Sequence, residues 1–198
     1  HTQCVVRGVE RALVVADLPF GTYQSNPEKA LESAVRMMTE GGAHAIKIEG
    51  GKEIEESIKK IVNAGIPVMG HLGLTPQSIY QFGTYKVRAK EEAEAEKLIA
   101  DCKLLEDIGC FAIVLEKIPA ELAKKATESI TIPTIGIGAG QNCDGQVLVY
   151  HDMVGMNQGF SPKFLRRYLD LYTEITGAVS QYVKDVKNAE FPNDSESY

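Results

Sequence analysis

A short apolar strand followed by an amphipathic helix recurs along this chain, and this alternation constrains its fold more than any other feature. Apolar runs of strand length occur at residues 11–17, 43–49, 66–71, 111–116, 132–137 and 146–150. Apolar residues with helical spacing occupy residues 26–40, 52–63, 90–109, 119–129 and 163–186, the last as one long helix or a broken pair. Strands that alternate with helices predict a parallel sheet covered by helices.

Two α/β architectures fit this pattern, a (βα)8 TIM barrel and a doubly wound sheet, and in both of them functional residues gather at the carboxyl ends of the strands. The predicted strand ends carry Asp17, Lys47, Glu49, His71 and Glu116. The periodic spacing favours the barrel, with about six βα units present. Residues 136–141 lack the third glycine of a dinucleotide-binding fingerprint, which also favours the barrel over a doubly wound sheet. We expect one barrel domain over residues 1–198, N-terminally incomplete, with a frayed tail at 191–198.

Composition excludes several classes of function. Apolar residues make up 44% of the 198 residues and the net charge is -6, which indicates a globular protein and disfavours a nucleic-acid partner. No apolar run approaches the roughly 20 residues of a membrane helix, and no signal peptide opens the sequence, so we expect a cytoplasmic protein with no membrane partner. The four cysteines are scattered, as is typical of reduced thiols rather than a zinc site.

Lys47 and Glu49 lie two residues apart in a predicted strand, so their side chains point to the same face. A structural ion pair and a binding site are equally consistent with this stretch alone. A lysine at a site could hold a substrate carboxylate or form a Schiff base, and the nearby acid favours the first role because it keeps the amine charged.

The acids at the strand ends suggest further chemistry. Asp17 and Glu49 are oxygen donors of the kind that Mg²⁺ prefers. Glu116 ends an apolar strand, where desolvation would make its carboxylate a stronger base. A base, a divalent cation and a carboxylate-binding lysine together describe proton abstraction next to the carbonyl of an α-keto acid. His71 is interpreted equally well as a substrate contact or as a structural histidine. The glycine turn at 138–140 is better explained as a tight turn than as an anion site.

Four motifs occur in order along the chain: ADLPF at 16–20, KIEGG at 47–51, GHLGLTPQ at 70–77 and GIGAG at 136–140. Together they resemble the ketopantoate hydroxymethyltransferase family, and the likeness runs from His1 to about Pro192. The resemblance implies a (βα)8 barrel of the phosphoenolpyruvate mutase and isocitrate lyase type, assembled as a homodecamer. It implies transfer of a hydroxymethyl group from 5,10-methylenetetrahydrofolate to α-ketoisovalerate (3-methyl-2-oxobutanoate), which forms ketopantoate for pantothenate and coenzyme A synthesis.

The resemblance also implies a role for each residue. Asp17 matches a Mg²⁺ ligand that also contacts substrate, and Lys47 matches the lysine that binds the substrate carboxylate. Glu49 matches an acid at the metal site, and Glu116 matches the proton acceptor. His71 lies where the family has its substrate pocket.

The sequence departs from the family at its start. Relatives carry an Asp-Ser pair in two earlier strands, and nothing before His1 holds that pair. We therefore expect this truncated chain to be impaired unless the missing piece is supplied. Two alternatives remain open: a related Mg²⁺-dependent lyase or mutase acting on another α-keto acid, and a non-catalytic barrel fragment. The lyase is disfavoured because no cysteine follows a strand in the manner of those relatives.

Overall fold

The computed structural model describes residues 1–198, which divide into two compact units, His1–Val147 and Leu148–Tyr198. The first unit contains one six-stranded sheet in which every neighbouring pair of strands is parallel. Its strands are β1 Val15–Asp17, β2 Ala45–Glu49, β3 Val68–Gly73, β4 Ala112–Glu116, β5 Thr134–Ile137 and β6 Gly145–Gln146.

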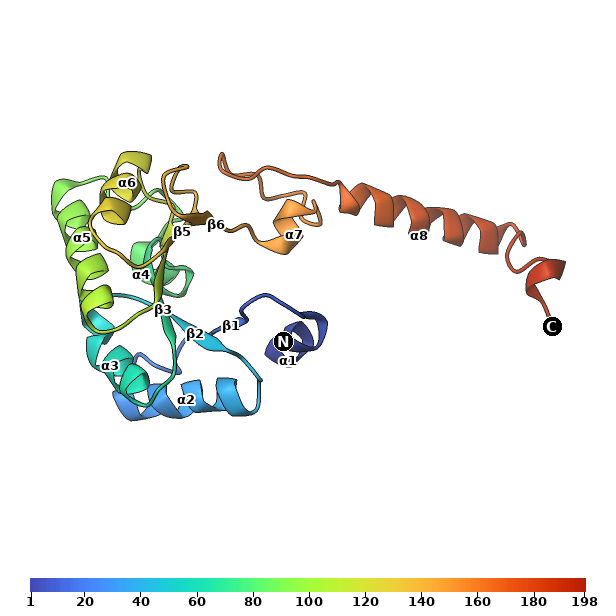
Figure 1. Ribbon diagram of the computed structural model, residues 1–198. Helices are drawn as coiled ribbons and strands as arrows, with labels where there is room; N and C mark the ends of the chain where they lie inside the picture. The colour runs from blue at the N-terminus through green and yellow to red at the C-terminus, as the bar shows by residue number, and fades with distance from the viewer. The chain divides into compact units, whose positions relative to one another are not determined.

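The strands lie in the sheet in the order in which they occur along the chain, from β1 to β6. A doubly wound sheet reverses its strand order at a switch point, whereas a barrel adds each strand beside the previous one. The strands curl into a half-barrel with the helices outside it (Figure 1). The prediction of a (βα)8-type α/β fold with about six units is therefore confirmed.

Helices cover one face of this sheet. They are α2 Pro27–Thr39, α3 Glu55–Asn63, α5 Glu92–Asp107 and α6 Ala120–Glu128. The unit also contains the short helices α1 Thr2–Gly8 and α4 Ile79–Phe82 and the single 3₁₀ turns η1 Lys52–Ile54 and η2 Pro76–Ser78. Figure 1 shows α2, α3, α5 and α6 following one another around the outside of the strands. The predicted start of α2 is confirmed, because the Asn26 side chain accepts a hydrogen bond from the Lys29 N–H and Pro27 occupies the first turn.

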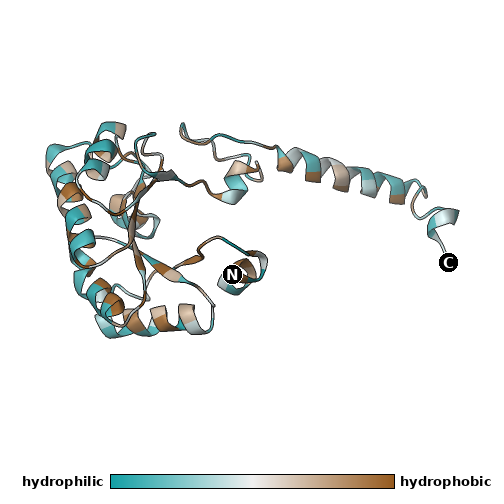
Figure 2. Ribbon diagram, in the orientation of Figure 1, coloured by the Kyte–Doolittle hydropathy of each residue, from teal (hydrophilic) through white to brown (hydrophobic).

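The two faces of the sheet differ in chemistry because successive residues of a strand point to opposite sides. The helix-facing residues form the buried core together with the helices, and in the strands they include Ile46, Ile48, Val68, Leu72, Ile113 and Leu115. The apolar colour along the strands and on the inner sides of the helices follows this core (Figure 2). The opposite face carries the charged residues predicted from the sequence. Apolar burial therefore fixes the sheet from one side and leaves the other side for polar groups.

The second unit contains α7 Tyr150–Met153, α8 Leu171–Lys187 and the 3₁₀ turn η3 Asp194–Glu196. The loop between α7 and α8 is held by Arg167, whose guanidinium donates hydrogen bonds to the backbone carbonyls of Asn157 and Phe160. No residue of α8 is buried. Among all these helices, none combines the length and the apolar character that a membrane crossing needs.

Three element predictions are wrong in extent. The strand expected at 11–17 begins only at Val15, where the register of β1 against β2 starts. Of the strand expected at 146–150, only Gln146 belongs to β6; the Val147 N–H still donates to the Gly136 carbonyl, and the pairing stops there because β5 ends at Ile137. The helix expected at 163–186 begins only at Leu171. Tyr168 donates its N–H to the carbonyl of Met153 in α7 rather than to the carbonyl four residues before it, and Asp170 caps the helix. The single-domain boundary and the frayed tail at 191–198 stay predictions.

Candidate active site

The register of the sheet places the five predicted residues on the face opposite the helices. Asp17 pairs with Lys47 across β1 and β2, and Glu49 pairs with His71 across β2 and β3. Residues paired across parallel strands point to the same side, as do residues two apart in one strand. Glu116 lies two residues beyond the partner of His71 on β4, so it shares this face. The carboxyl ends of four consecutive strands thus supply one cluster.

Short distances connect the members of this cluster. Lys47 Nζ lies 2.8 Å from Asp17 Oδ2 and 3.3 Å from His71 Nδ1. His71 Nδ1 lies 3.7 Å from Glu49 Oε1, and its Nε2 lies 3.2 Å from Glu116 Oε2. The ion pair between Lys47 and Glu49 that the sequence left open does not form, since Lys47 pairs with Asp17 instead. All five predicted residues are brought together.

His71 occupies the middle of the cluster and is buried. When Lys47 donates to Nδ1, the proton of a neutral imidazole resides on Nε2. Nε2 is buried and close to Glu116, yet its geometry makes no hydrogen bond to that carboxylate or to any other group. A buried polar atom without a partner is rare in folded proteins. Nε2 is therefore a polar atom of the cluster that still has the capacity for a hydrogen bond.

The carboxylate of Glu49 is almost inaccessible, with 4% of its side chain exposed, and it is fixed from one side. Its Oε2 accepts a hydrogen bond from the Gln77 N–H at 2.9 Å. Burial raises the pKa of Glu49, and the negative charge of Asp17 adds to this effect. The charges of His71 and Lys47 and the Gln77 N–H act on this pKa in the opposite direction. Asp17 pairs with Lys47, and Glu49 lies two residues further along β2, so both acids lie on the same face of the sheet.

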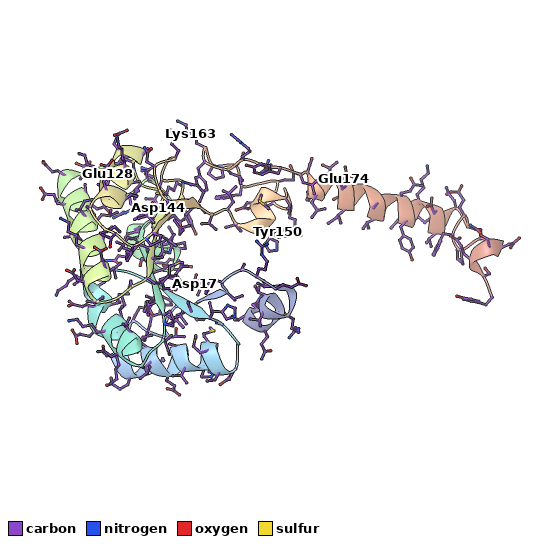
Figure 3. All side chains as sticks on the ribbon, viewed as in Figure 1. Asp17, Glu128, Asp144, Tyr150, Lys163 and Glu174 are labelled. Atoms are coloured by element: carbon purple, nitrogen blue, oxygen red, sulfur yellow. The ribbon has the colours of Figure 1, made fainter.

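The residues present fit a Mg²⁺ ion with few protein ligands. Asp17 lies at the end of β1 with 51% of its side chain exposed, so it can reach a solvated cation (Figure 3). No group of three or more His, Cys, Asp or Glu residues forms a metal-binding cluster. Magnesium commonly binds through one or two carboxylates and completes its shell with water and substrate oxygens. Asp17 and Glu49 are such a pair, whereas a zinc site would need more protein ligands.

Two residues of the site were not assigned a role from the sequence. Gln77 donates its backbone N–H to Glu49, and Tyr23 donates its hydroxyl to Gln77 Oε1 at 2.8 Å. Gln77 belongs to the GHLGLTPQ motif, which was the available signal for it. Tyr23 lies in the connection between β1 and α2, where a buried aromatic residue alone does not suggest a site.

The glycine turn after β5 has the backbone of a tight turn. Gly138 and Gly140 have φ values of 64° and 81°, in the left-handed region that favours glycine. A Cβ atom at Gly140 would lie 2.5 Å from Ala120 Cβ, so α6 also requires a small residue here. These contacts agree with the structural explanation of the turn.

A separate cavity of about 790 Å³ lies between η1, α4 and α5, on the other side of β3. None of the five cluster residues lines it. Its charged side chains pair with one another, since Arg88 pairs with Glu94 while stacking on Phe82, and Lys97 pairs with Asp101. The chemistry expected at the strand ends is therefore not located in this cavity.

The family model described as ketopantoate hydroxymethyltransferase matches residues 1–194. Three relatives, each named 3-methyl-2-oxobutanoate hydroxymethyltransferase, align with all 198 residues of this chain. The protein from Flavobacterium johnsoniae is 71% identical, that from Bacteroides thetaiotaomicron 63% and that from Salinibacter ruber 61%. The alignments cover 73%, 72% and 75% of those proteins, respectively.

Among solved structures, the orotidine 5'-monophosphate decarboxylase of Methanocaldococcus jannaschii superposes with a TM-score of 0.51 and 16% identity. The superposition covers 71% of this chain and 64% of the decarboxylase. At this identity the likeness concerns the fold alone.

Proposed function

Because this chain belongs to the ketopantoate hydroxymethyltransferase family, we propose that its strand-end cluster transfers a hydroxymethyl group from 5,10-methylenetetrahydrofolate to 3-methyl-2-oxobutanoate. The product is ketopantoate. The observation that carries the proposal is the connected cluster of one lysine, one histidine and three acids on a single face of the sheet. An α-keto acid offers a carboxylate and a carbonyl oxygen, which a lysine and a histidine of this kind can bind.

In this proposal Lys47 binds the substrate directly, and Asp17 and Glu49 bind it through a Mg²⁺ ion. Lys47 would hold the carboxylate of the keto acid, exchanging part of its contact with Asp17 for the substrate. Asp17 and Glu49 would hold a Mg²⁺ ion. When bound, that ion supplies a positive charge that polarises the keto oxygen and favours the enolate. The orphaned Nε2–H of His71 would donate a hydrogen bond to a substrate oxygen, which orients the keto acid.

Proton transfer falls to Glu116, whose carboxylate is mostly buried and lies beside the imidazole of His71. It accepts the proton from the methine carbon of 3-methyl-2-oxobutanoate, and the electron pair of that C–H bond moves into the enolate. The enolate carbon then forms a C–C bond to the methylene carbon of the folate, while the C–N bonds of that carbon break. A water molecule supplies the hydroxyl group, and tetrahydrofolate leaves with two new N–H bonds. One of the two protons comes from that water, and the other is the proton that Glu116 had accepted, so Glu116 returns to its carboxylate form. The methylene carbon already has the oxidation level of formaldehyde, so no redox partner is needed.

Deuterium washout tests this assignment. 3-Methyl-2-oxobutanoate deuterated at its methine carbon is incubated with the full-length enzyme, Mg²⁺ and tetrahydrofolate in ordinary water, and loss of deuterium is followed by proton NMR. We expect washout that stops when the cation is chelated with EDTA. Glu116→Gln should slow it by roughly 10²- to 10⁴-fold, the usual contribution of a general base.

The matched control is Glu121→Gln, which makes the same change at an exposed position of α6 and should leave washout unchanged. No washout by the wild-type protein would mean that enolisation of this keto acid is the wrong chemistry. Undiminished washout by Glu116→Gln would remove Glu116 as the base.

Assembly and location complete the proposal. An unburied apolar stripe along α8 supports a homo-oligomer, for which the family resemblance suggests a decamer; it consists of Tyr172, Ile175, Val179, Tyr182 and Val186. The four free cysteines agree with a reducing compartment such as the cytoplasm. Sedimentation equilibrium tests the assembly, and a mass equal to one chain at micromolar concentration would contradict it.

A further inference from the structure

Gln77, in the η2 turn after β3, joins the end of β2 to the loop that follows β1. Its backbone N–H donates to Oε2 of Glu49, the last residue of β2, at 2.9 Å. Its side-chain Nε2 donates to the Leu18 carbonyl at 2.8 Å, in the loop after β1. Its Oε1 accepts the Tyr23 hydroxyl at 2.8 Å and the Gln24 side-chain amide at 3.1 Å. One residue thus contacts the end of one acid-bearing strand and the segment that follows the other.

The partners of Gln77 are rigidly placed. Tyr23 and Leu18 are both fully buried, with 1% and 0% of their surfaces exposed. The Tyr23 hydroxyl also accepts the Glu49 N–H at 3.3 Å, and the Ser57 hydroxyl donates to the Tyr23 carbonyl. Burial raises the pKa of Tyr23, so its hydroxyl stays protonated and able to donate. The network leaves the carboxamide of Gln77 little freedom to move.

Only a carboxamide satisfies both partners at this position. The Leu18 carbonyl requires a donor and the Tyr23 hydroxyl offers its proton to an acceptor, and glutamine provides both from one planar group. Leu18 directly follows Asp17, and its own N–H donates to the Lys47 carbonyl. A shift of Leu18 would therefore move Asp17 relative to Glu49.

We propose that Gln77 is a positioning residue that fixes the separation of the Asp17 and Glu49 carboxylates and so sets their affinity for a divalent cation. The inference rests on the cation site of the proposed function and assigns Gln77 and Tyr23 to it. Groups that orient the ligands of a metal typically change its affinity by roughly 10- to 100-fold when they are removed. Gln77 acts through its hydrogen bonds and contacts neither the cation nor the substrate.

Calorimetric titration of the whole chain with Mg²⁺ alone tests the proposal. Gln77→Met keeps the length of the side chain and removes all three of its side-chain hydrogen bonds, and it should raise the Kd for Mg²⁺ by about tenfold or more. Gln77→Glu keeps the acceptor and loses the donor, and it should also weaken binding. Tyr23→Phe removes one hydroxyl, and it should weaken binding less when Gln77 is already methionine, because the two residues share one bond.

Three controls separate the possible results. Gln81→Met makes the same change at an exposed position four residues further on, and it should bind Mg²⁺ as the wild type does. Thermal unfolding shows whether each variant is folded, and kcat at saturating Mg²⁺ should recover to within a few-fold of wild type if only positioning is lost. Glu49→Gln should abolish binding.

The outcomes distinguish the two proposals. If Glu49→Gln binds Mg²⁺ as the wild type does, the cation site of the proposed function is wrong. If Glu49→Gln loses binding while folded Gln77→Met and Tyr23→Phe both retain it within twofold, the site stands and the role of Gln77 is overturned. Should Gln77→Met fail to fold, Tyr23→Phe decides the question, because it removes a single atom from the same network.

Discussion

The contact between β3 and α5 offers a direct test of how the sheet is packed. Gly70 lies on the helix-facing side of β3, and Leu105 of α5 is completely buried against it. A Cβ atom at Gly70 would lie 2.7 Å from Leu105 Cδ1, closer than carbon atoms can approach, and 3.7 Å from Ile113 Cγ1, an ordinary contact. Gly70→Ala and Leu105→Ala should therefore each lower the free energy of unfolding. In the double variant the two effects should partly compensate each other.

The magnitudes follow from the atoms involved. Leu105→Ala removes three buried carbons, worth about 0.8 kcal/mol each, and the remaining cavity brings the expected loss to about 3 to 4 kcal/mol. Gly70→Ala overpacks the same contact. Alanine also lowers the backbone entropy of the unfolded chain, which offsets part of that strain, so we expect the free energy of unfolding to fall by about 1 to 2 kcal/mol. In the double variant the new methyl group occupies space that Leu105 vacates. We expect a total loss of about 2 to 3 kcal/mol, roughly 2 kcal/mol less than the sum of the single losses.

Urea unfolding followed by circular dichroism measures the free energy of unfolding for the wild type, both single variants and the double variant. The matched control is the pair Gly8→Ala and Leu105→Ala, since a Cβ atom at Gly8 meets nothing within 4 Å. That pair should be additive. Additivity within about 0.5 kcal/mol for Gly70 and Leu105 as well would refute the close approach of α5 to β3.

Three further predictions concern single residues. Burial raises the pKa of both Cys102 and Cys110 to about 12, so below pH 9 their thiolate fraction is about a thousandfold smaller than that of an ordinary thiol. Iodoacetamide at pH 8 should label exposed Cys4 first, and Cys102 and Cys110 should react only as the pH rises or urea unfolds the chain. Equal labelling rates of Cys4 and the two buried cysteines at pH 8 would contradict the burial. Gly177→Ala should stabilise α8 by about 1 kcal/mol, because alanine favours a helix over glycine and a Cβ atom there meets nothing within 4 Å. The thermal midpoint of the helical circular dichroism signal should rise, and a lower midpoint would contradict the open space around Gly177. Asn26→Ala should lower the free energy of unfolding by about 1 kcal/mol through loss of the cap on α2, while Asn26→Ser should lose much less; equal losses would argue against capping.

The sequence by itself determined the layered α/β architecture. Alternating apolar strands and amphipathic helices permit few other arrangements, because each apolar face must be buried against a neighbour. The alternation of side chains along a strand also determined that Lys47 and Glu49 share a face. Since parallel strands bring their carboxyl ends to one edge, the sequence further placed Asp17, His71 and Glu116 near them. The structure brings these five residues together, and their roles stay predictions.

Tertiary structure alone decided how those residues are paired. The register of β1 against β2 sets Lys47 beside Asp17 rather than Glu49, and register depends on packing between elements that are far apart in the sequence. The shortened β6 and the late start of α8 were decided in the same way, by neighbouring backbone that local propensity cannot reveal. Gln77 became visible only because its hydrogen bonds connect segments up to 59 residues apart. Local pattern thus determined which residues reach the site, and long-range packing determined what each of them contacts there.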